Sequence, residues 1–305
     1  MKKLLTTILF ISHLSGTDYI DYLHPFHPTT SSNGMVVSQN ALSSNIGTQI
    51  LDMGGNAVDA AVAVGFSLAT TLPRAGNLGG GGFMLVYIKD KNEIFYIDYR
   101  SKSPRNSSIE KLLGTEKIPE RNSKLWERVD YTYLASGVPG TVYGLLEAHK
   151  NFGVLTLEQI MKPVIEQAEN GIVVSSDLNY VIDVTPQLRS DAESFSIFFD
   201  NGEPLKEFSI MRRPDLANTF KEISKHGAKG FYEGIVADKI VEAMKKNDGL
   251  ITHDDLKNYK SFFRMPIALN YKGHIVYTAG PPSGGGITLL TALGVLNNID
   301  IKKYK

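Results

Sequence analysis

The chain has 305 residues, of which 42% are hydrophobic and 21% are charged. This is the composition of an ordinary globular protein, and it does not fit a disordered or a membrane-embedded protein. Lysine and arginine together number 32, as do aspartate and glutamate, so charge gives no reason to expect nucleic acid or acidic lipid as a partner. Cysteine is absent, which excludes disulfides, a thiol nucleophile and cysteine-bound metal.

The first 16 residues have the pattern of an export signal. Met1-Lys2-Lys3 is a short basic segment, and the apolar run Leu4–Leu14 has signal-peptide length but is too short to span a bilayer. A cytosolic N-terminal helix is the alternative, because Ser15-Gly16-Thr17 is not an Ala-x-Ala cleavage site. We therefore expect a periplasmic or secreted protein with no membrane span, in which residues 17–33 form a poorly ordered lead-in.

Two consecutive helices are predicted next. From Gln39 onward, apolar residues recur at helical steps until Gly54-Gly55 ends the helix. Asn56 then caps a second helix, with Asp59 at its third position to hold the exposed amides of the first turn. The second helix carries little charge, which predicts burial on most of its faces, and Pro73 ends it.

Four consecutive glycines, Gly79–Gly82, are the most informative stretch of the chain. They precede two apolar runs, Phe83–Ile88 and Ile94–Tyr99, which the polar turn Lys89–Asn92 joins into a hairpin with cover expected on both faces. Glycine costs backbone entropy in regular structure, so the run predicts positive φ angles or a close approach of another segment or a ligand. With Arg100 directly after the hairpin, we interpret this region as the corner of a binding site. A flexible linker is the alternative.

The rest of the chain continues as mixed helices and strands. The polar segment Ser101–Arg128 reads as a long surface excursion, and the small residues Ala135–Thr141 open a helix to about Asn151 with Pro139 in its first turn. Thr156 is expected to cap the next helix and Gly171 to close it, and further helices are expected at Ser176–Val184, at Asp215–His226, at Ile235–Lys246 and after Thr252. Two strands, Ile267–Tyr271 and His274–Thr278, follow. A second glycine-rich loop, Ala279–Ile287, then opens a last helix.

Familiar catalytic motifs are missing from the sequence. Gly76–Gly82 lacks the Lys-Ser/Thr of a P-loop, and Pro281–Gly286 lacks the spacing of a dinucleotide fingerprint. No His-x-x-x-His pair or carboxylate cluster has metal-ligand spacing, and no Gly-x-Ser-x-Gly elbow occurs. His149, His226 and His253 fall at helix ends, where a capping or surface role is expected. The residues alone therefore predict one binding feature, no metal, no cofactor and no nucleophile.

Six motifs together resemble one family, the γ-glutamyltransferases (γ-glutamyltranspeptidases, glutathione hydrolases). The likeness runs from about Gly34 to Lys305 and keeps the family's order. The motifs are Gly54–Ala63, Pro73–Met84, Asp98-Tyr99-Arg100, Ala135–Thr141, Leu250–Tyr259 and Pro281–Ile287.

The resemblance implies an α/β fold, the αββα sandwich of the N-terminal-nucleophile hydrolases, here incomplete without a C-terminal small subunit. Family members are precursors that cut themselves into a large and a small subunit, and the new N-terminal Thr of the small subunit is the nucleophile. It attacks the γ-glutamyl amide of compounds such as glutathione, and the acyl group passes to water or to an amino acid. The family position that binds the substrate α-carboxylate falls on Arg100. The alternative for Arg100 is a surface side chain paired with a neighbour such as Asp98.

The chain departs from the family in one large respect. Its Thr-Thr pairs (Thr6-Thr7, Thr29-Thr30 and Thr70-Thr71) do not match the family's Thr-Thr-His processing site. Residues 34–305 are therefore interpreted as a truncated large-subunit portion with no catalytic residue of its own, inactive alone and in need of the small subunit. Gly284 also replaces a common Ser. The alternatives are a related acylase, of cephalosporin or polyglutamate type, or a non-catalytic binding remnant of a decayed precursor.

Overall fold

The computed structural model describes residues 30–299 and 303 of the chain. Its contacts divide the chain into Met1–Met35 and one compact unit, Val36–Lys305, which is described below. The expected export signal and most of the expected lead-in lie outside the described residues. Within the part that the structure describes, no helix is long and apolar enough to cross a membrane.

Helices α1 (Ala41–Asp52) and α2 (Ala57–Thr71) form where the sequence predicts them and pack against each other in the helical layer. Gly54 adopts a φ of +89° after α1, and the amides of Gly54 and Gly55 return to carbonyls of the last helical turn, which confirms the glycine cap. Asn56 and Asp59 form the expected reciprocal capping box at the start of α2. Eleven of the 15 residues of α2 are buried, in agreement with its low charge.

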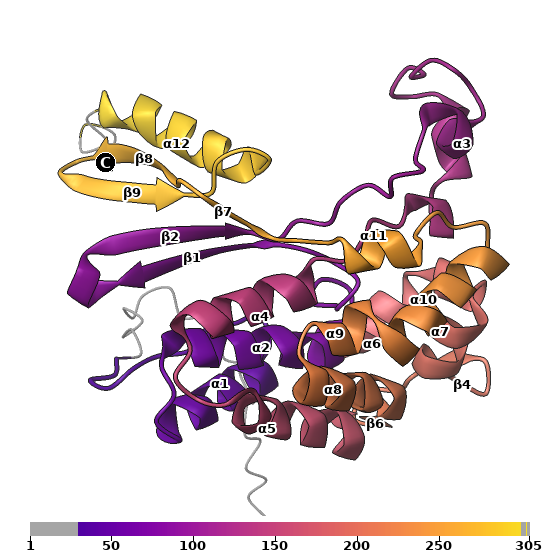
Figure 1. Ribbon diagram of the computed structural model, residues 1–305, viewed down its shortest axis with the longest axis horizontal. Helices are drawn as coiled ribbons and strands as arrows, with labels where there is room; N and C mark the ends of the chain where they lie inside the picture. The colour runs from indigo at the N-terminus through magenta and orange to yellow at the C-terminus, as the bar shows by residue number, and fades with distance from the viewer. Residues whose placement is uncertain (1–29, 300–302, 304–305) are drawn as a thin grey trace, which may run out of the picture. The chain divides into compact units, whose positions relative to one another are not determined.

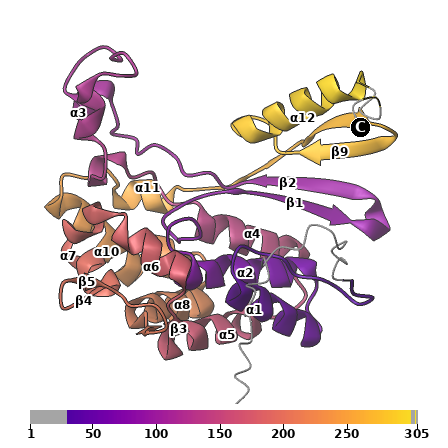
Figure 2. The ribbon, with the colours of Figure 1, turned by 180° about the vertical axis from the view of Figure 1, so that it is seen from behind.

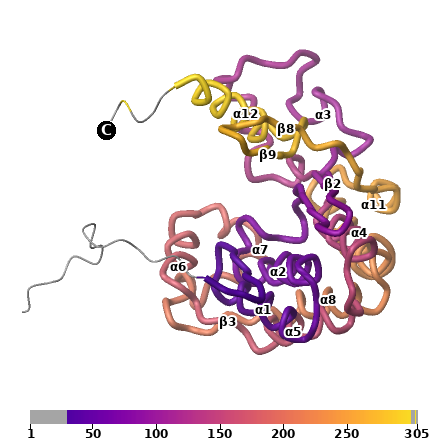
Figure 3. Tube along the Cα trace, turned by 90° about the vertical axis from the view of Figure 1, so that its left-hand side faces the viewer, coloured from indigo at the N-terminus to yellow at the C-terminus, as the bar shows by residue number. Residues whose placement is uncertain are grey.

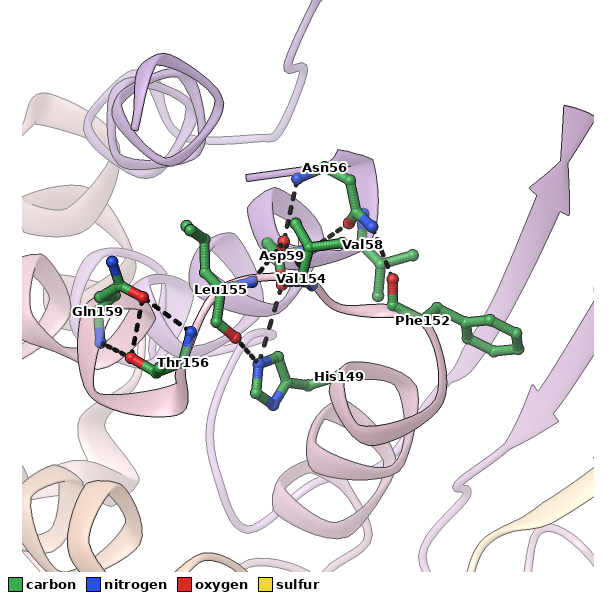
Figure 4. A network of polar contacts seen from close by, with 9 residues as sticks. All are labelled: Asn56, Val58, Asp59, His149, Phe152, Val154, Leu155, Thr156 and Gln159. Atoms are coloured by element: carbon green, nitrogen blue, oxygen red, sulfur yellow. Dashed lines mark hydrogen bonds and ion pairs between the residues drawn. The ribbon is translucent and has the colours of Figure 1, made fainter. Parts of the chain in front are cut away.

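The Asp59 carboxylate does more than cap α2 (Figure 4). It is fully buried, and besides Asn56 N at 3.0 Å it accepts the amides of Val154 at 3.1 Å and Leu155 at 3.3 Å. His149 Nε2 donates to the Leu155 carbonyl at 2.8 Å and lies 3.9 Å from Asp59 Oδ1. One carboxylate therefore joins the start of α2 to a loop almost a hundred residues later.

The glycine run leads into an antiparallel hairpin, β1 (Phe83–Ile88) and β2 (Glu93–Asp98), joined by the 3-10 turn Lys89–Lys91. A short strand, β7 (Phe262–Arg264), pairs with β2 on its other side and was not predicted. Met84, Val86 and Ile88 pack into the core, whereas Leu85 is 41% and Tyr87 57% exposed. The expected cover on both faces therefore holds for β2, whose adjacent residues Tyr96 and Ile97 are fully buried, and is wrong for β1, an edge strand that only one layer covers well.

Four layers follow one another in the compact unit (Figures 1 and 2). Helices α2 and α4 cover one face of the β1–β2–β7 sheet, the hairpin of β8 (Ile267–Tyr271) and β9 (His274–Thr278) lies over the other face, and α12 (Gly284–Asn297) covers that hairpin. The same order appears in the perpendicular view (Figure 3). Tyr96, fully buried between the layers, donates from its hydroxyl to Gly280 O at 3.3 Å. This is the predicted αββα arrangement, with three and two strands in its sheets.

The remaining elements build the helical layer and its edges. The other predicted helices occur where the sequence places them: α4 (Thr141–Phe152), α5 (Leu157–Asn170), α6 (Ser176–Asp183), α8 (Pro214–His226), α10 (Gly234–Lys246) and the short α11 (His253–Lys257). Short elements complete the chain: α3 (Ile109–Leu113), α7 (Ala192–Phe198), α9 (Lys229–Tyr232), 3-10 turns Lys124–Arg128, Tyr133–Ala135 and Pro186–Arg189, and strands β3 (Ile172–Val173), β4 (Phe199–Asp200), β5 (Glu203–Pro204) and β6 (Ile210–Met211).

Helix α4 begins later than predicted. Its N-cap is Gly140, so Pro139 precedes the helix and is not in its first turn. The Pro139 carbonyl instead accepts the hydroxyl of Tyr232 at 2.9 Å. By contrast, Thr156 caps α5 through the expected side-chain bonds, and Gly171 closes α5 at a φ of +89°.

Candidate substrate-binding site

The glycine run packs against the segment that carries Arg100. Gly82 and Tyr99 exchange both backbone hydrogen bonds, with N–O distances of 3.0 and 3.3 Å, and so extend the β1–β2 ladder by one pair. A Cβ atom at Gly81 would lie 2.3 Å from Ser101 N. Gly79–Gly82 have no positive φ angles. Close approach of another segment, and not a left-handed backbone, is therefore what the run provides.

A second segment closes on the same residues from the start of α4. The Gly80 carbonyl accepts the amides of Gly140 at 2.7 Å and Thr141 at 3.1 Å, which satisfies two exposed donors of the helix N-terminus. Lys102 and Val138 form an isolated antiparallel bridge with N–O distances of 2.7 and 3.2 Å. A Cβ atom at Gly140 would lie 1.9 Å from Tyr99 O. The two small-residue motifs thus enclose the backbone of residues 99–102 from both sides.

Three tyrosines complete this enclosure. Tyr259 donates to Arg100 O at 2.9 Å, and its ring stacks on Tyr232 at 5.7 Å between centroids. Tyr232 accepts the amide of Tyr143 at 3.2 Å. Burial raises the pKa of both Tyr232 and Tyr259 well above its usual range, and burial raises the pKa of Tyr99 to about 12. These phenols therefore stay protonated at neutral pH and serve as hydrogen-bond donors or packing groups, not as bases.

Arg100 itself is an exposed residue at the end of a buried strand. Its backbone amide donates to Asp98 Oδ1 at 3.1 Å, while Asp98 Oδ2 accepts Nε of Arg264 at 2.7 Å. The carboxylate that was expected as an alternative partner for Arg100 is therefore occupied by Arg264. Within residues 30–299, the Arg100 guanidinium makes no hydrogen bond or ion pair.

The surroundings of Asp98 are rich in positive charge. Lys102 donates from Nζ to Lys260 O at 2.7 Å and lies over the ring of Phe262, 4.2 Å from its centroid. Burial lowers the pKa of Lys102, and the charge of Asp98 opposes that effect. One buried carboxylate and three cationic side chains, including Arg100 and Arg264, leave a positive excess that suits an anionic ligand.

Arg264 is the residue that the sequence did not reveal. It ends β7, a strand of three residues, which is too short to show a periodic pattern. Its only sequence signal is a charge after two aromatic residues. The predicted absence of a metal centre stays a prediction, although no group of three His, Asp or Glu side chains in the described part of the chain could hold a metal ion. His253 bonds to Asp238 at 2.8 Å, as expected of a histidine at a helix end.

Comparisons with known proteins identify the fold. The structure superposes on the γ-glutamyltranspeptidase of Helicobacter pylori with a TM-score of 0.84 and 36% identity, over 92% of this chain and 79% of that one. It also superposes on the cephalosporin acylase of Bacillus halodurans with a TM-score of 0.77 and 25% identity, over 93% of this chain and 53% of that one. The fold is therefore that of the N-terminal-nucleophile hydrolases, as the motifs imply.

The family follows from the sequence comparisons. The model described as Gamma-glutamyltranspeptidase matches residues 43–305. The glutathione hydrolase proenzyme of Escherichia coli (strain K12) is 40% identical over 284 residues, which cover 92% of this chain and 47% of that protein. The chain belongs to the γ-glutamyltranspeptidase family, and it spans about half the length of the curated relatives it matches.

Proposed function

We propose that this chain supplies the large-subunit portion of a γ-glutamyl hydrolase and transferase, in which Arg100 binds the α-carboxylate of the substrate. The observation that carries the proposal is that the Arg100 backbone is fixed while its guanidinium is left unpaired by the described residues. Its backbone is held by Asp98 and Tyr259, and its guanidinium is exposed and has no protein partner among the described residues. A planar guanidinium can meet both oxygens of a carboxylate at once.

In this reaction the chain positions the substrate and its partner supplies the nucleophile. Arg100 fixes the α-carboxylate, so that the γ-carbonyl lies at a constant place relative to it. An N-terminal Thr of the small subunit attacks that carbonyl, its hydroxyl proton passes to a base, and the amine leaves with a proton. Water or an amino acid then attacks the ester and restores the threonine. The substrates are γ-glutamyl compounds such as glutathione.

Exposed apolar surface supports the need for a partner. The side of the hairpin away from the core, strands β7 to β9 and helix α12 expose large apolar side chains: Leu85, Tyr87, Phe262, Phe263, Met265, Ile275, Tyr277, Ile287, Leu289 and Val295. Helix α12 has only Gly286 buried although its sequence is almost wholly apolar. Surfaces of this kind usually mark protein interfaces. We assign this one to the small subunit of the same enzyme.

The direct test is reconstitution. The chain, co-expressed with the small-subunit half of a curated relative, is assayed for p-nitroaniline release from γ-glutamyl-p-nitroanilide, with each half alone as the control. We expect turnover only in the mixture. A soluble complex that binds but never turns over would favour the non-catalytic remnant instead.

A related acylase is the second candidate, because the cephalosporin acylase of Bacillus halodurans shares the fold over 93% of this chain. The same complex is therefore offered amides whose acyl group lacks an α-carboxylate. Preference for these over γ-glutamyl-p-nitroanilide would assign the acylase activity and remove the role proposed for Arg100.

Export is the remaining part of the proposal and follows from the basic and apolar pattern of residues 1–16. Expression of the full chain followed by osmotic shock checks it. We expect the chain in the periplasmic fraction, shortened near residue 16. Retention of the full mass in the cytoplasm would contradict export.

A further inference from the structure

A cavity of about 510 Å³ lies away from Arg100, between the C-terminal end of α2 and helices α6, α7 and α8. Its volume is within the range of small-molecule sites. Most of its wall is apolar, and the lining includes Leu72, Leu78, Val181, Ile182, Leu188 and Phe198.

One charged side chain in this wall is not neutralised. Arg213 directly precedes α8, and its backbone amide donates to Ala168 O at 2.9 Å. Its guanidinium carbon lies 5.8 Å from the centroid of the Phe198 ring, which also lines the cavity. The side chain forms no hydrogen bond or ion pair with any described residue, and burial lowers the pKa of Arg213, an effect that Asp215 only offsets in part. A partly buried cation without a counter-ion is unfavourable.

The other charged groups of the wall are already satisfied by one another. Arg74 and Asp177 form an ion pair at 3.0 Å at the exposed rim. An entering molecule therefore meets an apolar interior with one cation that still needs a partner. A zwitterionic γ-glutamyl compound does not suit this wall, because its ammonium group would compete with Arg74 for Asp177.

We propose that this cavity binds an amphipathic monocarboxylate, an aliphatic acid whose chain lies among the apolar side chains and whose carboxylate pairs with Arg213. A charge-assisted pair would supply the direct carboxylate partner that Arg213 does not have among the described residues, where Asp215 acts without forming an ion pair. The site is separate from the γ-glutamyl chemistry and does not depend on it.

Binding of decanoate below its micellar concentration, measured by isothermal titration calorimetry on the full chain, tests the proposal. Decanol is the matched neutral ligand, and Arg212→Met is the matched variant, because Arg212 is the exposed neighbour of Arg213. We expect one site per chain, decanoate at least tenfold tighter than decanol, and an at least tenfold loss in Arg213→Met only. Equal binding of decanol and decanoate by the parent overturns the proposal without any variant. The proposal is also overturned if Arg213→Met and Arg212→Met both bind decanoate as tightly as the parent. Decanoate would then be binding to the exposed apolar faces.

Discussion

Gly81 is the position where the close approach of two backbones can be tested most sharply. In Gly81→Ala, the new Cβ atom would lie 2.3 Å from Ser101 N, 2.7 Å from Tyr99 O and 2.8 Å from Arg100 C. Carbon atoms normally stay about 3.5–4.0 Å from such neighbours. All three atoms belong to the backbone, so no side-chain rotation can relieve the contact, and the segment that carries Arg100 must move.

The expected cost follows from what that movement breaks. Overpacking costs about 1–3 kcal/mol, and the two hydrogen bonds between Gly82 and Tyr99 are worth about 1 kcal/mol each. We therefore expect Gly81→Ala to lower the free energy of unfolding by about 3–5 kcal/mol. Gly80 is the matched control, because a Cβ there would meet nothing nearer than 3.4 Å and its φ is not positive. Gly80→Ala should change stability by less than about 1 kcal/mol.

Pulse proteolysis in urea, at low protein concentration, measures both variants under the same conditions. If Gly81→Ala and Gly80→Ala unfold at the same urea concentration, the glycine run is not required for close approach. A large loss in both would equally contradict that requirement, because a Cβ atom at Gly80 would make only ordinary van der Waals contacts, at 3.4 Å or more.

Three further predictions concern the rest of the molecule. Asp59→Ala should lower the free energy of unfolding, measured in urea, by about 3–5 kcal/mol, because three backbone amides lose a fully buried acceptor; a loss below about 1 kcal/mol would show that water replaces it. Because burial raises the pKa of Tyr99 from 10.0 to about 12, its contribution to stability is complete below pH 10 and declines above it as the unfolded state ionises. The parent should therefore lose about 1 kcal/mol more than Tyr99→Phe between pH 8 and pH 11, whereas parallel curves would contradict burial of the phenol. The isolated chain should self-associate in light scattering and become monodisperse with the small-subunit half; a monodisperse isolated chain would be evidence against the exposed interface. The isolated chain should also show neither γ-glutamyl release nor self-cleavage by mass; either would contradict the proposal that the small subunit supplies the nucleophile.

Local chemistry made much of the fold predictable. The cap of α2 by Asn56 and Asp59 depends on neighbours within one turn, and the sequence contains all of them. The end of α1 at Gly54 and the β8–β9 hairpin are local in the same sense. The additional bonds from Asp59 to Val154 and Leu155 were not predictable, since they depend on how α4 and α5 pack.

The candidate site shows the same limit. The glycine run predicted a close approach, but only the fold shows that residues 99–102 are what it approaches. The sequence left Asp98 as the alternative partner of Arg100, and only the fold shows that Arg264 of β7 occupies this carboxylate. Leu85 and Tyr87 were expected to be covered but are exposed. The sequence pattern of a strand shows that its residues are hydrophobic, but it does not show whether this chain or a partner covers them.

The kinetics of Arg100→Ala, in the complex with the small-subunit half, test the central claim most directly. Loss of a charge-assisted contact to a desolvated carboxylate costs about 2–4 kcal/mol, which is about 30- to 1000-fold in kcat/KM for γ-glutamyl-p-nitroanilide. Arg100→Lys should recover only part of this, because an ammonium group cannot meet both oxygens. For 4-aminobutyryl-p-nitroanilide, which lacks the α-carboxylate, parent and Arg100→Ala should react equally slowly. If Arg100→Ala keeps its kcat/KM for the γ-glutamyl substrate within about twofold of the parent, Arg100 is an ordinary surface residue and the site assignment is wrong.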